Sequence, residues 1–577
     1  MTSDKCLTTS DKEKASTFNS YFAQIGSTLA KKHQQNQTPN KQIYRVTPVC
    51  SNIEIDNKAI LKQFLKLTKP GKAAGLDNFT AKDLHIIGPP ALEALKHVFK
   101  KSLDTLEIPK IWKTSRVTCI FKSGSKQECE NYRPISLLSI PSKIMESIIC
   151  NTLDKHLQTF NLLYERQWGF RPNRSTKLAL LNMTERWRKS LDENKFVAIF
   201  FLDFRKAFDC LDHQVIMRKL SACGVSGNLY QWISSYLEER QQKTVVNGVV
   251  SENEYVQTGA PQGSLLGPRL FSLTANDLPD VSNDHEEDLF ADDTTGTCVS
   301  DTIDTVFIKA QKMVDDISKW SHENSLTIHP KKSVIMILSP KQFIGPLNKI
   351  NMDGELVSIV TKTKCLGVTI DDKLQWNDHL SSITKFFSVK IKKLYSMRML
   401  STKSLNTIYL QGILPSVTYA ISLWGNCADN LIDQLDNLHI KAARFVHRIR
   451  KNIPTNEVLG VARWRSFGEM YKEQIAVLTY KLQTDQLPLP LAKFKPQPKN
   501  RRTLRNNHRV VPPKFNKVSY KRSFAYRSCI VWNQLSNECT SCQCVNSFKT
   551  KLKNELYNIN FKQPVGARMS NRDFIYY

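Results

Sequence analysis

The chain has 577 residues, and its 41% hydrophobic and 23% charged content allow a sizeable core and several domains. Lys and Arg number 82 against 53 Asp and Glu, which gives a formal net charge of +29. This surplus favours a polyanionic partner. A membrane surface is the competing partner, but no apolar run reaches spanning length and no lipidation motif occurs. A polar N-terminus and 14 scattered cysteines argue against a secretory signal and a disulfide framework.

The first 52 residues form a polar lead-in, within which apolar residues at helical spacing predict a helix over residues 18–30. From residue 53 the pattern becomes globular. The apolar run over residues 117–122 predicts a strand that ends in Lys122 and is followed by a Ser-Gly-Ser turn.

Further basic residues follow in two loops. Arg133 stands directly before Pro134, and Arg171 and Arg174 lie beside aromatic residues in the loop over residues 167–176. Each of these side chains taken alone is usually a solvated surface charge. Together, ahead of a set of carboxylates, they indicate a surface that grips phosphates and a template backbone.

Three carboxylates stand where secondary structures end. The apolar run over residues 197–202 predicts a buried strand, and Asp203 follows it directly. Asp292 and Asp293 stand together in the stretch Leu289–Thr295. An Asp-Asp pair by itself is most often a polar turn. A strand ending in Asp and a distant Asp-Asp hairpin can instead hold two divalent cations roughly 3.5–4 Å apart for phosphoryl chemistry.

The segment between these carboxylates contains two further polar features. Asp209 and His213 lie four residues apart, which favours a structural hydrogen-bonded pair over a metal site. Residues 240–250 predict a hairpin with Asn247-Gly248 as its turn. A Gly-Pro-rich loop then places Gln262 between Pro and Gly, where a backbone can approach a ligand closely.

Downstream of the Asp-Asp pair, the pattern predicts an amphipathic helix over residues 305–324 and a strand over 334–338. Residues 364–370 predict one further strand, tightened by Gly367. The pattern from 377 to 483 is mainly helical.

The C-terminal region is strongly basic. Residues 486–537 contain twelve Lys or Arg residues and no acidic residue. Arg501, Arg502 and Arg505 form its centre, which predicts a nuclear localisation patch, a nucleic-acid-binding arm or both, with a solvated linker as the alternative. The nearby cluster Cys539, Cys542 and Cys544 lacks a following His or a second Cys pair, which favours coincidence over a zinc site.

Taken in order, these segments resemble the reverse transcriptases of non-LTR (LINE-type) retrotransposons, closest to the jockey and CR1-like groups. The matching motifs run through about half of the chain in the family's order. They are Lys72–Asp77, Lys122, Asn131–Ser136, Gly169–Arg171, Phe201–Asp203, Phe208-Asp209, Pro261–Gly263, Phe290–Asp293, Lys332 and Cys365–Gly367. Each motif alone is weak, whereas the ordered series is specific.

The resemblance implies an α+β right-hand polymerase with fingers, a ferredoxin-like antiparallel palm, a helical thumb and a basic C-terminal extension. The implied boundaries are a lead-in at 1–52, fingers at 53–190, palm at 191–376, thumb at 377–485 and a nucleic-acid-binding region at 486–577.

The resemblance also implies an RNA-directed DNA polymerase that uses two Mg²⁺ ions, with Mn²⁺ as a substitute. Asp203, Asp292 and Asp293 match the catalytic carboxylates, and Asp203, Asp292 and the main-chain carbonyl of Phe204 match the metal ligands. The residues that match the family's nucleotide contacts are Lys122 and Arg133 (triphosphate), Phe208 (steric gate, or an ordinary core residue), Gln262 (pocket amide) and Lys332 (proton donor to pyrophosphate).

The implied partners are template RNA, a DNA primer or target and deoxynucleoside triphosphates, with no membrane, in a ribonucleoprotein of the nucleus or cytoplasm. The family's endonuclease is expected to be absent, since a polar lead-in leaves no room for it. Departures from the commoner residues occur at Ala260, Arg269, Thr274, His329 and Cys365. The alternatives are a decayed copy that only binds RNA or DNA, or another right-hand polymerase.

Overall fold

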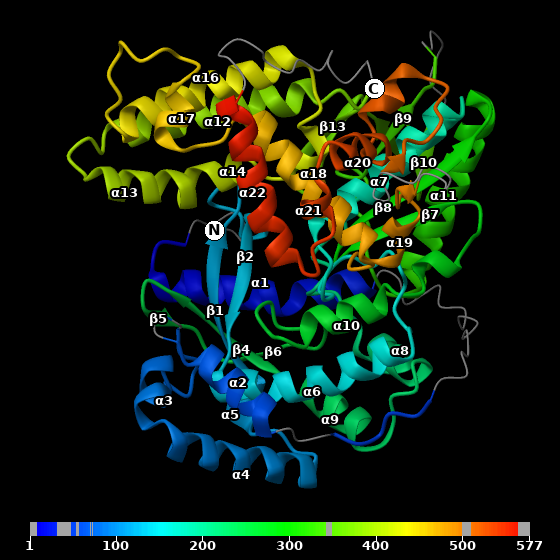
Figure 1. Ribbon diagram of the computed structural model, residues 1–577. Coiled ribbons are helices and arrows are strands. Elements are labelled where there is room, and N and C mark those ends of the chain that lie inside the picture. Colours follow the sequence, from blue (N-terminus) through cyan, green and yellow to red (C-terminus); the bar gives the residue numbers. More distant parts are fainter. Residues whose placement is uncertain are drawn as a thin grey trace.

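A six-stranded sheet built around β3 (Phe196–Leu202) organises the chain (Figure 1). The computed structural model describes residues 8–31, 48–53, 57–69, 71, 73–341, 349–498 and 509–562. Lys72, Arg501, Arg502 and Arg505 lie outside these residues. The spatial order of the central sheet is β10 (Ile350–Met352), β11 (Glu355–Ile359), β9 (Val334–Leu338), β3, β8 (Asp293–Ser300) and β7 (Glu286–Phe290).

The four strands β9, β3, β8 and β7 are antiparallel, and with the helices between them they have the order of a ferredoxin-like βαββαβ motif. The sheet as a whole is not antiparallel, because β11 pairs in parallel with β9. The chain passes β9, runs back along the outer strand β10, and turns into β11 in the original direction. The expectation of an antiparallel sheet is therefore wrong for this edge.

The two faces of β3 belong to different cores, which explains its continuous apolar sequence. Ala198, Phe200 and Leu202 pack into a core that includes α11 (Ile303–Glu323). The alternate residues Val197, Ile199 and Phe201 pack into a second core with α7 (Thr176–Asp192). The predicted helix over 305–324 and strand over 334–338 are confirmed by α11 and β9.

A second, smaller sheet has the order β2 (Tyr132–Leu137), β1 (Thr114–Phe121), β4 (Gln241–Val246) and β5 (Val249–Val250), with β6 (Glu254–Tyr255) also on β4. Its edge strand β2 tolerates Pro134, which has no amide hydrogen to donate. The predicted β4–β5 hairpin is confirmed, since Asn247 and Gly248 have φ values of 49° and 86°, as a type I′ turn requires.

Helix α1 (Asp11–Lys31) includes the predicted helix over 18–30 and packs against β4 (Figure 1). Phe18 and Phe22 are buried against Val117 of β1. Asn19 is also buried, donates to the carbonyl oxygens of Gln242 and Glu252, and accepts from Thr244 Oγ1 at 3.0 Å. Residues 11–31 are thus part of the packed structure and not a loose lead-in.

A group of helices shares one hydrophobic core with the α11 face of the central sheet. Several of them lie in the lower part of Figure 1. They are α2 (Asn57–Leu67), α3 (Ala81–Ile87), α4 (Pro89–Thr105), α5 (Lys110–Lys113), α6 (Ile140–Thr159), α8 (His213–Ala222), α9 (Gly227–Leu237) and α10 (Gly267–Thr274).

The chain after the central sheet is mainly helical, as predicted. Its helices are α12 (Asn377–Tyr395), α13 (Thr402–Thr407), α14 (Leu414–Val417), α15 (Ile421–Trp424), α16 (Asp429–Val446), α17 (Val458–Ala462), α18 (Phe467–Gln483), α19 (Leu489–Ala492), α20 (Phe524–Asn533), α21 (Asn537–Thr540) and α22 (Val545–Lys562).

The basic C-terminal region docks on the rest of the chain through α18 and α7. Helix α18 packs against α20 and α22. Glu185 of α7 accepts the first amide hydrogens of α20, from Phe524 at 2.6 Å and Ala525 at 2.9 Å. A carboxylate at a helix N-terminus satisfies orphan donors and matches the helix dipole.

One predicted strand is wrong. Residues 364–370 fall in a hairpin of β12 (Lys362–Cys365) and β13 (Val368–Asp371). Leu366 and Gly367 both have positive φ, 45° and 88°, and so form its two-residue turn. Within the described ranges, no helix is both long and apolar enough to cross a membrane.

The docking of α1 depends on the Asn19 amide. We expect Asn19→Ala to destabilise the contact by about 1–3 kcal/mol, because the buried Gln242 carbonyl and Thr244 hydroxyl lose the hydrogen bonds of the Asn19 side chain. Hydrogen exchange of the α1 amides measures this loss. The matched control is Gln24→Ala on the exposed face of α1. Equal α1 exchange in the two variants would contradict the assigned role of Asn19.

Candidate active site

Strand pairing brings Asp203 and Asp293 together. The β3–β8 register ends with Leu202 opposite Thr294, so Asp203 follows and Asp293 precedes that pair. Residues directly opposite one another on antiparallel strands have Cβ atoms about 4.5–5.5 Å apart. Asp292 is in the two-residue turn that joins β7 to β8. The three predicted carboxylates therefore lie at one end of the central sheet.

The turn that carries Asp292 is held in a strained conformation by a neighbouring loop. Ala291 has a φ of 57°, which favours glycine. Gly169 touches its backbone, because a Cβ at Gly169 would lie 2.6 Å from the Ala291 nitrogen. The amide of Trp168 also donates to the carbonyl of Leu289 at 2.7 Å. The Gly-Phe-Arg segment thus acts as a support of the Asp-Asp turn.

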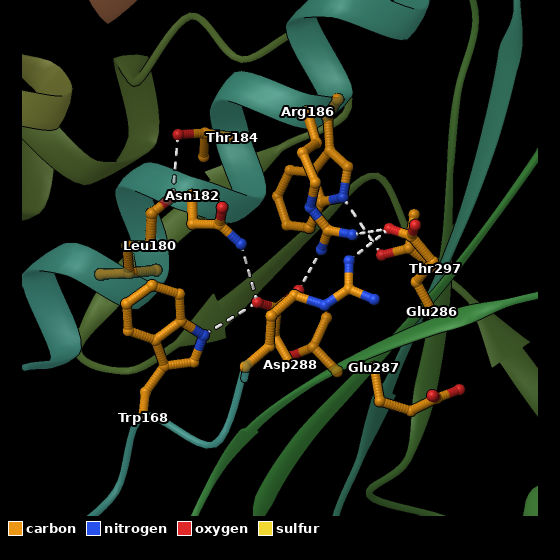
Figure 2. Close-up of polar contacts among 12 residues, drawn as sticks. Trp168, Leu180, Asn182, Thr184, Arg186, Glu286, Glu287, Asp288 and Thr297 are labelled. Atoms are coloured by element: carbon orange, nitrogen blue, oxygen red, sulfur yellow. Dashed lines mark hydrogen bonds and ion pairs between the residues drawn. The ribbon is translucent and has the colours of Figure 1, made fainter. Parts of the chain in front are cut away.

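Figure 2 shows a second support, in which side chains converge on the buried carboxylate of Asp288 from one side of β7. Trp168 Nε1 donates to Asp288 Oδ1 at 2.9 Å, and Asn182 Nδ2 donates to the same oxygen at 3.0 Å. Arg186 pairs with Asp288 and with Glu286, two residues earlier on the strand. This network fixes β7 against α7. Sequence reasoning missed it, because Asp288 resembled one more turn aspartate.

Desolvation and neighbouring negative charge raise the pKa values of Asp292 and Asp293. Partial desolvation is the larger cause of the raised pKa of Asp292, and the negative charge of Asp203 adds to it. The pKa of Asp293 rises to about 6, first through desolvation and then through Asp292 and Asp203. Like charges held together in this way favour the binding of a cation.

Two predicted basic residues border the carboxylates. Lys122 directly follows β1, and Arg133 lies on β2 opposite Ile120. Both side chains are exposed. Desolvation raises the pKa of Asp292, whereas the positive charges of Arg133 and Lys122 each lower it. Lys122 has the same effect on Asp293. The β1–β2 hairpin therefore presents two exposed cations toward the carboxylate end of the central sheet.

Lys206 belongs to the same region, although no sequence pattern indicates it. Its Nζ donates to the carbonyl oxygens of Glu130 and Tyr132, each at 3.2 Å, and so joins the turn after β3 to the β1–β2 hairpin. Desolvation is the main cause of its lowered pKa, and the charges of Lys122 and Lys332 lower it further. Lys332, which is exposed, therefore faces the same region.

The backbone after β3 is fixed by the segment before β9. The Asp203 amide donates to Ser333 Oγ at 3.1 Å, and its carbonyl accepts from the His329 amide at 2.8 Å. Phe204 forms an antiparallel bridge with Ile328. The flanking residues make the hydrogen bonds of this bridge, so the Phe204 carbonyl turns to the other side, where β8 lies.

Main-chain hydrogen bonds fix the Pro-Gln-Gly loop between Phe208 and strand β2. The Phe208 carbonyl accepts from the Ala260 amide at 2.9 Å, and the Gln262 carbonyl accepts from the Ser136 amide at 2.9 Å. Phe208 is half-buried and packs against Phe271, with ring centroids 5.1 Å apart. The Pro-Gln-Gly loop thus joins the turn after β3 to strand β2.

The start of α10 is fixed by Glu146, a residue that sequence reasoning did not select. Its fully buried carboxylate accepts from the amides of Leu265 and Leu266 at 2.6 and 3.3 Å. Tyr236 donates to its other oxygen at 3.2 Å. Desolvation raises the pKa of Glu146. No local sequence pattern indicates such a residue, since its partners are at least 90 positions away along the chain.

One predicted relationship, the pairing of Asp209 with His213, differs in the structure. Asp209 and His213 are not paired: Asp209 accepts from Gln262 Nε2 at 2.9 Å, whereas His213 Nε2 contacts the Gly259 carbonyl at 2.9 Å. The loop that contains Gly259 and Gln262 supplies hydrogen-bond partners nearer than those one helical turn away.

Arg171 and Arg174 donate to the carbonyl oxygens of residues 164 and 165, and Arg174 also stacks over Trp168. Desolvation lowers both guanidinium pKa values, that of Arg174 to about 10.

The donor set fits a divalent metal ion whose coordination other groups complete. Among the described residues, no group of three or more His, Cys, Asp or Glu side chains is arranged to hold a metal by itself. Asp203, Asp292 and the Phe204 carbonyl supply hard oxygen atoms, which Mg²⁺ prefers, and Mg²⁺ typically keeps water or substrate phosphates as its other ligands.

Comparison with known proteins agrees with this arrangement. Residues 120–370 match the family model described as reverse transcriptase (RNA-dependent DNA polymerase). The chain is 27% identical over 387 residues to a probable RNA-directed DNA polymerase from transposon BS of Drosophila melanogaster. It is 28% identical to the RNA-directed DNA polymerase from mobile element jockey, and 29% identical to a probable one from transposon X-element, of the same species.

Each of these alignments covers 65% of this chain, and the chain spans 42–43% of the length of the relatives. The matched range contains Asp203, the Asp-Asp turn, Lys122 and Arg133. The resemblance to retrotransposon enzymes of the jockey group is therefore confirmed, and residues 120–370 are similar to the reverse transcriptase family.

Proposed function

We propose that this chain is an RNA-directed DNA polymerase that extends a DNA 3′ end on an RNA template. The observation that carries the proposal is the convergence of Asp203, Asp292 and Asp293 beside the exposed cations Lys122 and Arg133. Acidic residues for metal ions next to basic residues for a triphosphate are what phosphoryl transfer requires.

In this proposal the central sheet is the palm of a right-hand polymerase, the β1 sheet with α1 belongs to the fingers, and the helices from α12 onward form the thumb. The β1–β2 hairpin then stands over the palm, and Lys206 ties the two together. Exposed Lys385, Lys392 and Lys393 on α12 give the thumb a basic face for a template–primer duplex.

Asp203, Asp292 and the Phe204 carbonyl would hold Mg²⁺, with Mn²⁺ as a substitute. The bound ions would make the primer 3′-hydroxyl a better nucleophile and neutralise charge on the triphosphate. The chain's own residues orient the reactants. Lys122 and Arg133 bind the triphosphate, Arg133 as a planar two-donor group suited to phosphate oxygens. Lys332 is the proposed proton donor to the departing pyrophosphate.

The remaining proposed residues select the sugar of the nucleotide or bind the nucleic-acid backbone. The exposed part of Phe208 would clash with a ribose 2′-hydroxyl, while Phe271 supports its ring from behind. Arg171, Arg174 and the basic residues Arg501, Arg502 and Arg505 would contact nucleic-acid backbone. Such a chain would act in a ribonucleoprotein, in the nucleus or the cytoplasm.

Primer extension on poly(rA)/oligo(dT) with dTTP and Mg²⁺ tests the proposed function directly. We expect template-dependent growth of the primer. Duplex binding without any incorporation would overturn the proposal and favour a chain that only binds nucleic acid. Faster growth with ribonucleotides than with deoxynucleotides would instead favour an RNA polymerase.

Replacement of one carboxylate tests the metal assignment. We expect Asp292→Asn to lower incorporation at least about 100-fold, because the electrostatic stabilisation from a catalytic metal amounts to several kcal/mol. Template–primer affinity, measured by fluorescence anisotropy, should remain within about twofold of the parent, since the duplex contacts lie elsewhere. Asp301→Asn, an exposed aspartate just beyond the other end of β8, is the matched control. Similar incorporation by Asp292→Asn and Asp301→Asn would contradict the assignment.

Replacement of Phe208 tests the sugar gate. We expect Phe208→Ala to reduce discrimination against ribonucleotides about tenfold or more, because removal of the ring opens room for a 2′-hydroxyl. Phe208→Tyr keeps the ring and should keep the selectivity. The measurement is the ratio of single-nucleotide incorporation efficiencies for dTTP and UTP. An unchanged ratio in an active Phe208→Ala protein would make Phe208 a core residue only.

A further inference from the structure

A cavity of about 800 Å³ lies between the α7 face of the central sheet and the docked C-terminal region. Its walls come from α7, β7, β8, the segment that follows α19, the short paired strands β14 (Gln497–Pro498) and β15 (Val510–Val511), and α20. Figure 1 shows α7, β7, β8, α19 and α20 on the same side of the structure. The three catalytic carboxylates are not among the lining residues. The volume is that of a ligand pocket, roughly 300–1,000 Å³.

The four carboxylates in the wall of this cavity all have partners within the protein. The partners are Arg166 and Arg186 for Glu286, Lys195 for Glu193, Lys312 for Asp284, and the amides of Asn516 and Lys517 for Asp192. Their negative charges are therefore largely neutralised before any ligand binds.

Several cationic groups in the wall are not matched in this way. Lys493 and Lys514 are exposed lining residues, and neither forms an ion pair within the part of the chain that the structure describes. The side chain of Arg186 is only 10% exposed, and its terminal nitrogens pair with Glu286 and Asp288 (Figure 2). Its buried Nε has no hydrogen-bond partner among the described residues. Unmatched positive charge beside an unused buried donor suits an anionic ligand.

The charges around Lys493 agree with this conclusion. Desolvation is the first cause of its lowered pKa, and the neighbouring charges of Arg186 and Arg166 lower that pKa further. The charges of Glu286 and Asp288 act in the opposite direction. Three cations thus share two carboxylates, and an added anion would reduce the repulsion among them.

The other part of the wall is apolar. Trp187 and Phe494 are buried lining residues, while Val511 and Pro513 are more exposed. A ligand that joins a phosphate to a flat, largely apolar ring matches both parts of the wall, and a nucleotide has this composition. Bases within a duplex are already stacked and paired, so only an unpaired nucleotide can enter a concave site of this kind.

We propose that this cavity binds an unpaired stretch of RNA, with phosphates on Lys493, Lys514 and Arg186 and a base against Phe494 and Val511. The identity of the strand as template RNA rests on the proposed function. The site is separate from the catalytic carboxylates, so it would hold a part of the RNA that is not being copied.

Binding of a single-stranded probe tests the site without any incorporation of nucleotides. The full chain is first saturated with poly(rA)/oligo(dT), and fluorescent oligo(rC), which pairs with neither strand, is then titrated in. We expect the double variant Lys493→Gln/Lys514→Gln to bind oligo(rC) about tenfold more weakly than the parent protein. The slope of log affinity against log salt should fall by about 1.4, since each phosphate contact on a single strand contributes roughly 0.7.

Lys100→Gln/Lys101→Gln is the matched control, because both lysines are exposed on α4 and the change in net charge is the same. It should bind oligo(rC) within about twofold of the parent protein. Replacement of one cytidine in the probe by 4-thiouridine allows photocrosslinking. Crosslinked peptides from the parent protein should contain Phe494 or residues 510–520, and their yield should fall in Lys493→Gln/Lys514→Gln.

Three results would overturn the proposal: equal oligo(rC) binding by the two double variants, crosslinks confined to other segments, or an equal loss of affinity for a blunt RNA duplex. Displacement of oligo(rC) by poly-glutamate as readily as by unlabelled oligo(rC) would also overturn it and favour an acidic protein segment as the ligand. Absence of dTTP incorporation by the parent protein would instead overturn the proposed polymerase function, and it would leave these binding measurements unchanged.

Discussion

Seven residue pairs between β3 and β8, from Phe196 opposite Ser300 to Leu202 opposite Thr294, set the position of Asp203 beside the Asp-Asp turn. A slip of one residue would exchange the two faces of β3, and each face already fills a separate core. The packing of those cores therefore fixes the register. The register in turn fixes the distance between the carboxylates. No interaction among the carboxylates themselves favours their proximity.

Repulsion among these carboxylates is offset by contacts made behind them. The Asp288 network anchors β7 to α7, Gly169 supports the turn from outside, and Ser333 fixes the amide of Asp203. Lys206 connects the turn after β3 to the hairpin that bears Lys122 and Arg133. The carboxylates are held in place by supporting residues that take no part in the reaction. These supporting residues come from segments far apart in the chain.

The sequence was sufficient for features that depend on local pattern. An apolar run that ends in Asp203 indicates the end of a strand, and an Asp-Asp pair indicates a hairpin. Asn247-Gly248 indicates the turn of a second hairpin. The contact between Asp209 and Gln262 joins residues 53 positions apart and has no periodic signal. The prediction that Leu366 lies in a strand was wrong because nothing in its side-chain chemistry indicates a positive φ. The docking of α1 depends on Asn19, an amide that is polar in sequence and fully buried in the structure.

The central claim is that Asp203 and Asp292 form a site for two metal ions at the end of β3. Electron paramagnetic resonance of Mn²⁺ bound to the full chain, with a template–primer duplex and a non-hydrolysable thymidine triphosphate analogue, tests it most directly. We expect two ions coupled at roughly 3.5–4 Å, and loss of that coupling in Asp203→Asn. Two uncoupled ions, or the same coupling in the Asp203→Asn protein, would contradict it.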